Sequence, residues 1–207
     1  MAFRKIAKLI LTWVAITHLF CSCVKNILGC HQSFSFTVNA KVYPDKDTVN
    51  IGDTIFVEVN FPTMLSDSSS NAITDLSGAS GVSTDMGFVK LASDSPIVLD
   101  DAVPDFDFEL IYGKEIPPRP QDKELIKLFS FDETAGRFLF KLAIIPKDTG
   151  TFRFGLASAP DVEQKNSTCP TFTLNYLLKN TTNQHYYLYP GGTGVSPGGA
   201  DYYFYVK

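Results

Sequence analysis

Histidine is the residue type that could carry proton transfer near neutral pH, and the chain has three, His18, His31 and His185. A triad-type hydrolase would have to combine His185 with Cys169 or a serine as nucleophile, and no serine has the glycines of a nucleophile elbow. A zinc site would need the convergence of ligands that are mostly far apart in sequence: Cys30, His31, Cys169 and His185. The sequence therefore favours a protein that is not an enzyme and has no cofactor, with a hydrolase as the remote alternative.

Three carboxylates lie at alternate positions of one predicted strand, Asp105, Asp107 and Glu109, between apolar residues. Alternate residues of a strand share a face, so the three carboxylates would lie together. Oxygen ligands at short spacing suit Ca²⁺, which makes them a candidate calcium site. Because the spacing and glycine turn of a calcium loop are absent, the sequence favours a solvated outer face and no metal.

Tyrosines concentrate in the last 22 residues of the chain. We predict a C-terminal hairpin with strands at 186–189 and 202–206 and its tip at 190–199. Successive strand residues point to opposite faces, so exposed members could form a flat stacking surface for a glycan or a protein ligand. The candidate ligand-binding residues are Tyr187, Tyr189, Tyr203 and Tyr205. The alternative is that cross-strand aromatic pairs only stabilise the hairpin.

The N-terminal residues 1–22 are typical of an export signal. Arg4, Lys5 and Lys8 form a basic region, and the mostly apolar run 9–20 follows without an acidic residue. A run of this length is shorter than the roughly 20 apolar residues that span a bilayer. We therefore predict that residues 1–22 direct export and are removed.

Cys23 follows Ser22 directly after the apolar run, and this arrangement resembles the lipobox of bacterial lipoproteins. The resemblance implies that Cys23 becomes the lipidated first residue, that 23–32 form a tether, and that the lipid attaches the protein to a membrane. Lipidation at Cys30, after Ile-Leu-Gly, is one alternative, and an unlipidated secretory signal or a short uncleaved anchor is another. If Cys23 carries the lipid, Cys30 and Cys169 form a candidate disulfide in an oxidising compartment, or else remain separate thiols.

The 207 residues carry 18 basic and 22 acidic side chains, with 44% hydrophobic and 13% aromatic residues. Such a chain can bury a core and is about one domain long. Removal of residues 1–22 would leave 15 basic against 22 acidic residues, a net charge of −7. An acidic protein without clustered Lys and Arg is a poor partner for nucleic acid.

Strict alternation of apolar and polar residues begins at Ser33 and indicates a half-buried strand. Similar segments recur along the chain, separated by turn residues. We predict strands at 34–42, 55–61, 88–91, 106–112, 125–131, 138–145, 151–157, 171–177, 186–189 and 202–206. This pattern is typical of an all-β, antiparallel sandwich or barrel, and of the two we predict the sandwich. We expect a single domain over 33–207, in which 159–207 either extends the sandwich or forms an appended hairpin region.

Two segments interrupt the predicted strands. Residues 62–85 are rich in Ser and Gly and are longer than ordinary loops, which makes them a candidate for ligand capture. Residues 113–122 include Ile-Pro-Pro-Arg-Pro and predict a stiff, extended connector, because proline fixes φ and removes a donor.

The segment Val49-Asn-Ile-Gly-Asp-Thr-Ile and the corner Asp148-Thr-Gly-Thr-Phe152 resemble those of an immunoglobulin-like domain over about 34–158. With the lipobox-like cysteine, the short tether and the aromatic C-terminal strand, the whole chain is similar to cell-envelope lipoproteins of Bacteroidetes. The resemblance implies an outer-membrane lipoprotein that faces the periplasm or the exterior. We expect a binding or adhesion module. The alternative is a structural subunit of an envelope or fimbria-like assembly, in which an exposed final strand pairs with a neighbour.

Overall fold

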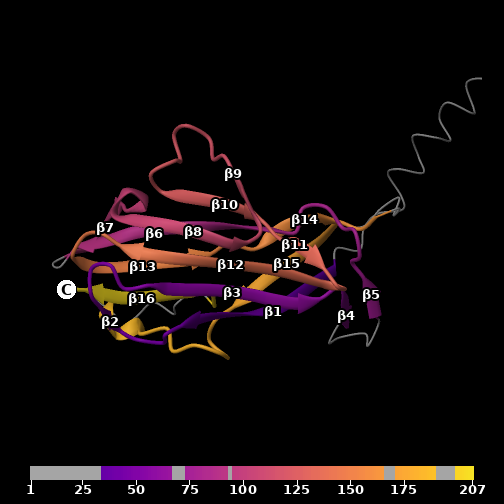
Figure 1. The fold of residues 1–207 in the computed structure, drawn as a ribbon, viewed down its shortest axis with the longest axis horizontal. Coiled ribbons are helices and arrows are strands. Elements are labelled where there is room, and N and C mark those ends of the chain that lie inside the picture. Colours follow the sequence, from indigo (N-terminus) through magenta and orange to yellow (C-terminus); the bar gives the residue numbers. More distant parts are fainter. Residues whose placement is uncertain (1–33, 67–72, 93–94, 166–170, 190–198) are drawn as a thin grey trace, which may run out of the picture.

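The computed structural model describes residues 34–66, 73–92, 95–165, 171–189 and 199–207. These residues form β-strands and two short 3₁₀ turns, η1 (Val103–Asp105) and η2 (Tyr186–Leu188), without an α-helix among them. The all-β prediction is confirmed. Most of the longer strands run along the long axis of the molecule, and the C-terminus lies at the end opposite β4 and β5 (Figure 1).

The strands form two seven-stranded sheets and one separate hairpin. The first sheet has the order β11 (Asp132–Thr134), β12 (Arg137–Pro146), β3 (Ile55–Pro62), β1 (Phe34–Tyr43), β15 (Thr171–Leu177) and β14 (Ala159–Glu163), with β8 (Phe106–Tyr112) also paired to β12. The second has the order β2 (Thr48–Val49), β16 (Asp201–Val206), β13 (Gly150–Leu156), β6 (Ser83–Ala92), β10 (Ile126–Ser130) and β9 (Lys114–Ile116), with β7 (Ser95–Asp101) also paired to β6. The hairpin is β4 (Met64–Ser66) and β5 (Ile73–Asp75).

Both sheets are mixed, which corrects the prediction of an antiparallel arrangement throughout. β1 runs parallel to β15, and β2 runs parallel to β16. Parallel neighbours need a long connection between them, and here nearly the whole domain lies between the paired strands. Local sequence patterns carry no information about such distant pairing. Residues 159–207 contribute β14 and β15 to the first sheet and β16 to the second.

Alternation along the strands places one set of side chains in the core. In β3, Ile55, Val57, Val59 and Phe61 are buried, and the residues between them point outward. Phenylalanines join the two sheets face to face: the rings of Phe106 in β8 and Phe152 in β13 lie 5.0 Å apart, and those of Phe129 in β10 and Phe140 in β12 lie 5.2 Å apart. Burial of each such side chain contributes about 1.5–3 kcal/mol, so these contacts fix the sheets on one core.

Several strands lie where the sequence predicts loops. The segment 62–85 contains β4, β5 and the start of β6, and the connector 113–122 begins with β9. β7, β11 and β14 are also unpredicted, and the start of β6 at Ser83 precedes the predicted 88–91. β11 pairs with β12 across Ala135 and Gly136, which both have positive φ, as a two-residue hairpin turn of type I′ requires. β9, β11 and β14 each pair with a longer neighbouring strand, which supplies their hydrogen bonds, whereas β4 and β5 pair with each other.

Candidate functional site

The tyrosine-rich C-terminal segment is not a hairpin. Residues 186–188 form η2 instead of a strand, and β16 pairs with β13 and β2. In a 3₁₀ turn residues three apart lie on one side, so the rings of Tyr186 and Tyr189 stack, with centroids 5.7 Å apart. Tyr187 points away from this pair and is 66% exposed. A strand over 186–189 would place Tyr187 and Tyr189 on one face, and the prediction of that strand is therefore wrong.

Tyr203 is only 3% exposed, on the outer face of β16. It packs with Val89 and Leu91, and the rings of Tyr186 and Tyr189 cover it edge-on at 5.7 and 6.0 Å. The Tyr203 amide donates to the Gln184 carbonyl oxygen, which ties the covering segment to the strand. The four candidate tyrosines thus do not form one exposed platform: Tyr203 is buried, and in β16 only Tyr205, 41% exposed, is open to solvent.

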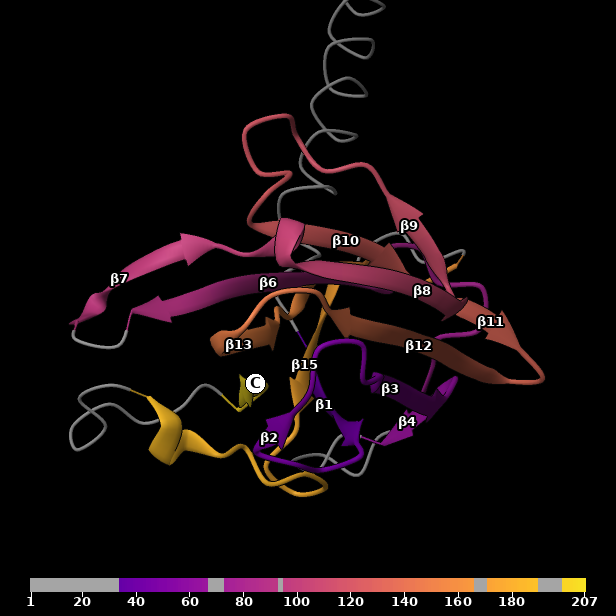
Figure 2. The same ribbon diagram turned by 60° about the vertical axis from the view of Figure 1, so that its left-hand side comes forward.

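The covering segment is held to the β1–β2 connection by polar contacts. His185, buried and in the left-handed region at φ +50°, has its Nε2 3.0 Å from the Asp45 carboxylate. The Tyr187 hydroxyl donates to the Asp47 carboxylate. This hydrogen bond lowers the pKa of Asp47 and raises the pKa of Tyr187 relative to their ordinary values. Figure 2 shows the segment, in yellow-orange, near β2 and the C-terminus.

The candidate calcium ligands do not converge. Asp105 ends η1 rather than lying on the strand, and Asp107 forms an ion pair of 3.0 Å with Lys147. Glu109 is exposed on the outer side of β8. Within the described ranges no three His, Cys, Asp or Glu side chains form a group that could hold a metal ion. Cys23, Cys30 and Cys169, with the lipidation and disulfide predictions, lie outside the described residues.

A different set of side chains gathers on the outer face of the first sheet. It combines aromatic rings, two lysines and polar groups from four neighbouring strands. We call it the lysine–tyrosine face, and its members are Lys41, Tyr43, Phe56, Glu58, Asn60, Tyr112, Leu139 and Lys141. They are exposed or half-buried, whereas the alternate residues of the same strands are buried in the core.

Strand register assembles this face in rows. Lys41 in β1 is opposite Glu58 in β3, which is opposite Lys141 in β12, which is opposite Tyr112 in β8. Directly opposite residues in an antiparallel pair have Cβ atoms about 5 Å apart. One continuous row of ammonium, carboxylate, ammonium and phenol groups therefore crosses four strands.

The next row supplies the aromatic base of the face. Tyr43 and Phe56 are opposite one another and stack, with ring centroids 5.2 Å apart. The Lys141 ammonium lies 5.0 Å from the Phe56 centroid and 5.4 Å from that of Tyr43, and Lys41 also lies 5.4 Å from Tyr43. Cation–π attraction holds both lysines over the rings. In the described part of the chain neither lysine forms an ion pair.

Hydrogen bonds fix the polar groups of this face. The Tyr43 hydroxyl donates to Glu58 Oε2 at 3.0 Å, and Arg137 Nε donates to Asn60 Oδ1 at 2.6 Å. The interaction of Lys141 with the Tyr43 hydroxyl raises the pKa of Lys141 above its ordinary value, and the nearby Glu58 charge acts in the same direction. Lys141 is therefore fully protonated at neutral pH, beside an acceptor that is already oriented.

A break in the register aims Tyr112 at this site. The pairing of β8 with β12 shifts between Lys141 and Leu142, which leaves Ile111 as the extra residue of a β-bulge. Gly113, at φ +108°, turns the chain directly afterwards, and a Cβ there would lie 2.7 Å from the Ser130 carbonyl oxygen. The bulge and the glycine place Tyr112 on the outer face, 48% exposed.

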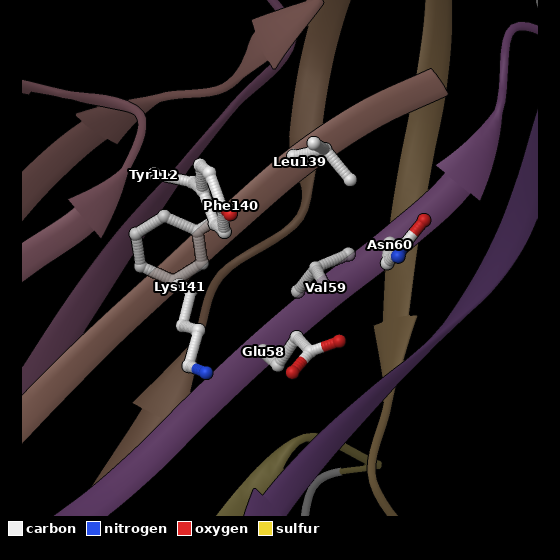
Figure 3. Close-up of a pocket in the computed structure, with 7 residues that line it drawn as sticks. All are labelled: Glu58, Val59, Asn60, Tyr112, Leu139, Phe140 and Lys141. Carbon is white, nitrogen blue, oxygen red and sulfur yellow. The ribbon is translucent and has the colours of Figure 1, made fainter. Parts of the chain in front are cut away.

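Five members of the lysine–tyrosine face line a shallow pocket of about 200 Å³ on the sheet surface. Its lining includes Glu58 and Asn60 along β3, Leu139 and Lys141 along β12, and Tyr112 from β8 (Figure 3). The arrangement offers hydrogen-bond donors and acceptors beside an exposed ring. It can bind a polar ligand that has one apolar surface.

Sequence reasoning missed this face, although part of its signal is visible. Phe56 occupies an outward, otherwise polar position of the predicted strand 55–61, and Tyr43 occupies the next outward position after the predicted strand 34–42. An aromatic side chain at an outward position is the sign that would have identified them. Tyr112 gives no such sign, because the bulge at Ile111 changes its direction.

No family model, curated protein or solved structure matches this chain. Among the residues that the structure describes, there is no helix with the length and apolar character needed to cross a membrane.

Proposed function

We propose that the protein is an exported, non-enzymatic binding module of the cell envelope, and that the lysine–tyrosine face is its ligand-binding surface. The observation that carries this proposal is the row from Lys41 to Tyr112, which presents an exposed ring on an open sheet face, with ammonium groups that form no ion pair among the described residues. Charged and aromatic groups held in this way contribute little to a core, and they supply both orientation and contact area to a ligand.

The contacts of the domain histidine support a non-enzymatic role. Nε2 of His185 faces Asp45, and its ring packs edge-on against Tyr187 and Tyr202. Among the described residues, no serine or threonine hydroxyl forms a hydrogen bond with this ring. A histidine so placed holds two segments together, and no hydroxyl of the described residues is positioned beside it as a nucleophile; Cys169 lies outside the described residues.

The location rests on the N-terminal sequence. Export through residues 1–22 and lipidation at Cys23 would place the module at the outer membrane, on its periplasmic or external side, with residues 23–32 as tether. The intact mass of membrane-extracted protein tests this proposal. A diacyl or triacyl mass on a chain that begins at Cys23 supports it, and an unlipidated mass excludes the lipid anchor.

An immunoglobulin-like character is part of the proposal. Two sheets packed on one core support it. The segment 49–55, which resembles that of an immunoglobulin-like domain, also supports it, because it forms a turn in which Gly52 has positive φ. An immunoglobulin domain has seven to nine strands in total, whereas each main sheet here has seven. We therefore propose an enlarged, mixed-sheet relative of that architecture.

The alternative of a structural subunit that polymerises through its final strand has less support. β16 pairs with β13 on one edge. On its other edge the amides of Tyr203, Tyr205 and Lys207 donate to carbonyl oxygens of Gln184, Asp47 and Val49. Strand addition there would first have to displace these contacts.

Binding of the exported domain, residues 33–207, to immobilised glycan and protein panels tests the function. Tyr112→Ala removes the exposed ring of the proposed surface, and Tyr205→Ala is the matched control, because it removes a similarly exposed tyrosine from the other sheet. We expect a ligand whose binding is lost in Tyr112→Ala and retained in Tyr205→Ala. Equal binding by both variants, or an absence of binding across the panels, would overturn the assignment of this face.

A further inference from the structure

We infer that the pocket between Glu58 and Lys141 binds one uncharged sugar unit of a glycan. This inference rests on the proposed function and names its ligand class. The pocket volume of about 200 Å³ is below the range of about 300–1,000 Å³ that encloses a whole drug-sized ligand. It suits a single ring, and the flat sheet around it leaves room for the remainder of a longer ligand.

The charges of the pocket lining favour a neutral ligand. Among the described residues that line the pocket, Glu58 and Lys141 carry opposite charges that balance, and Lys41 and Arg137 lie next to the lining, opposite Glu58 and bonded to Asn60. A uronic acid would meet the Glu58 carboxylate, and an amino sugar would meet the Lys141 ammonium. Juxtaposed like charges are unfavourable at a partly desolvated site, whereas hydroxyl groups can accept from one and donate to the other.

The hydrogen-bonding groups are set in complementary directions before a ligand arrives. Arg137 occupies the Asn60 Oδ1 atom, which leaves the Asn60 amide NH₂ as a donor. Tyr43 occupies Glu58 Oε2, which leaves Oε1 as an acceptor. An acceptor and two donors, the second being Lys141, match the vicinal hydroxyls of a sugar. Groups that are already ordered lose less entropy on binding.

The pocket also has an apolar wall. Tyr112 is 48% exposed, and Leu139 lies beside it on β12. A sugar ring has an apolar C–H face as well as polar edges, so an exposed aromatic ring can cover that face while the hydroxyls reach the polar groups.

Titration of the ¹⁵N-labelled domain with neutral trisaccharides of glucose, galactose and mannose tests the inference. We expect saturable amide shifts at residues 58–60, 112 and 139–141 with at least one of them. The corresponding uronic acid and amino sugar oligosaccharides should bind about tenfold more weakly or not at all. Glu58→Gln keeps the shape of the side chain and should weaken neutral-sugar binding about tenfold, and Tyr205→Ala should leave it unchanged.

The outcomes separate this inference from the proposed function. If neutral sugars cause no shifts but a charged glycan or a protein binds wild type and not Tyr112→Ala, the face is functional and the neutral-sugar assignment is wrong. If sugars bind but shift residues elsewhere, the pocket assignment is wrong. If no probe binds and Tyr112→Ala changes nothing in the panels, both proposals are overturned.

Discussion

Both sheets carry aromatic side chains on their outer faces, but another segment of the chain covers one of these faces and the other is open to solvent. On the second sheet, Tyr203 lies under η2 and is packed by Tyr186 and Tyr189. On the first sheet, Tyr43 and Phe56 support lysines, and Tyr112 remains half-exposed. A local concentration of tyrosines therefore identifies the structural cluster here, while the candidate binding surface comes from aromatics scattered over 70 residues.

The difference shows what covering an outer face requires. The segment that covers Tyr203 is fixed by the backbone hydrogen bond from the Tyr203 amide to Gln184 and by side-chain contacts with Asp45 and Asp47. The face with Lys41 and Lys141 holds its polar groups by hydrogen bonds within the sheet. The first arrangement provides stability, and the second leaves ordered groups available to a ligand.

The largest expected effect contrasts two tyrosines. Tyr203→Ala should lower the free energy of unfolding by about 3–5 kcal/mol, because it removes a buried ring from a packed cluster. Tyr112→Ala should lower it by less than about 1 kcal/mol, because half of that side chain is already in solvent. Urea unfolding of both variants measures the contrast, and similar losses would mean that the two faces do not differ as described.

A smaller effect is expected from the contact that holds the covering segment. His185→Ala removes the Asp45 contact and should cost about 1–3 kcal/mol of stability. Hydrogen exchange should accelerate at the Tyr203 amide, whose acceptor is Gln184, and stay unchanged at Glu58. His185→Asn is the matched variant, because Asn tolerates the left-handed backbone and can donate to Asp45. Unchanged exchange at Tyr203 in the alanine variant would contradict the covering role.

The smallest effect depends on pH and concerns Asp47 and Tyr187. The pKa of Asp47 is lowered in the folded protein. The stability that Asp47 contributes is therefore present above pH 3.8, its ordinary pKa, and is lost as the pH falls through the pKa of the folded state. The pKa of Tyr187 is raised in the folded protein. The stability that Tyr187 contributes is therefore present below pH 10.0, its ordinary pKa, and is lost as the pH rises through the pKa of the folded state. The stability difference between wild type and Tyr187→Phe should be level from about pH 5 to 9 and shrink on both sides.

Thermal melting across this pH range measures that difference. Tyr205→Phe serves as the control, because it removes a hydroxyl from an exposed tyrosine of β16 instead of η2. A difference for Tyr187→Phe that is constant from acid to alkaline pH would show that the contact with Asp47 adds nothing to the covering segment.

Much of the framework could be predicted from alternation alone. The predicted strands at 55–61, 106–112 and 138–145 lie within β3, β8 and β12, because period-two burial leaves a direct trace in the residues. The prediction of a strand at 186–189 is wrong, because consecutive tyrosines show no alternation of apolar and polar residues. Its conformation is decided by contacts of His185 and Tyr187 with residues 140 positions earlier.

The candidate site, too, depends on contacts between residues that are far apart in the sequence. The sequence by itself determined which residues face outward in the regular predicted strands such as 55–61, because alternating polarity divides a strand between core and solvent. It also determined the all-β class. Tertiary structure alone decided that Lys41, Glu58, Lys141 and Tyr112 form one row, since register and strand order arise from pairing between distant segments. It likewise decided which aromatic face the chain covers and which it leaves open.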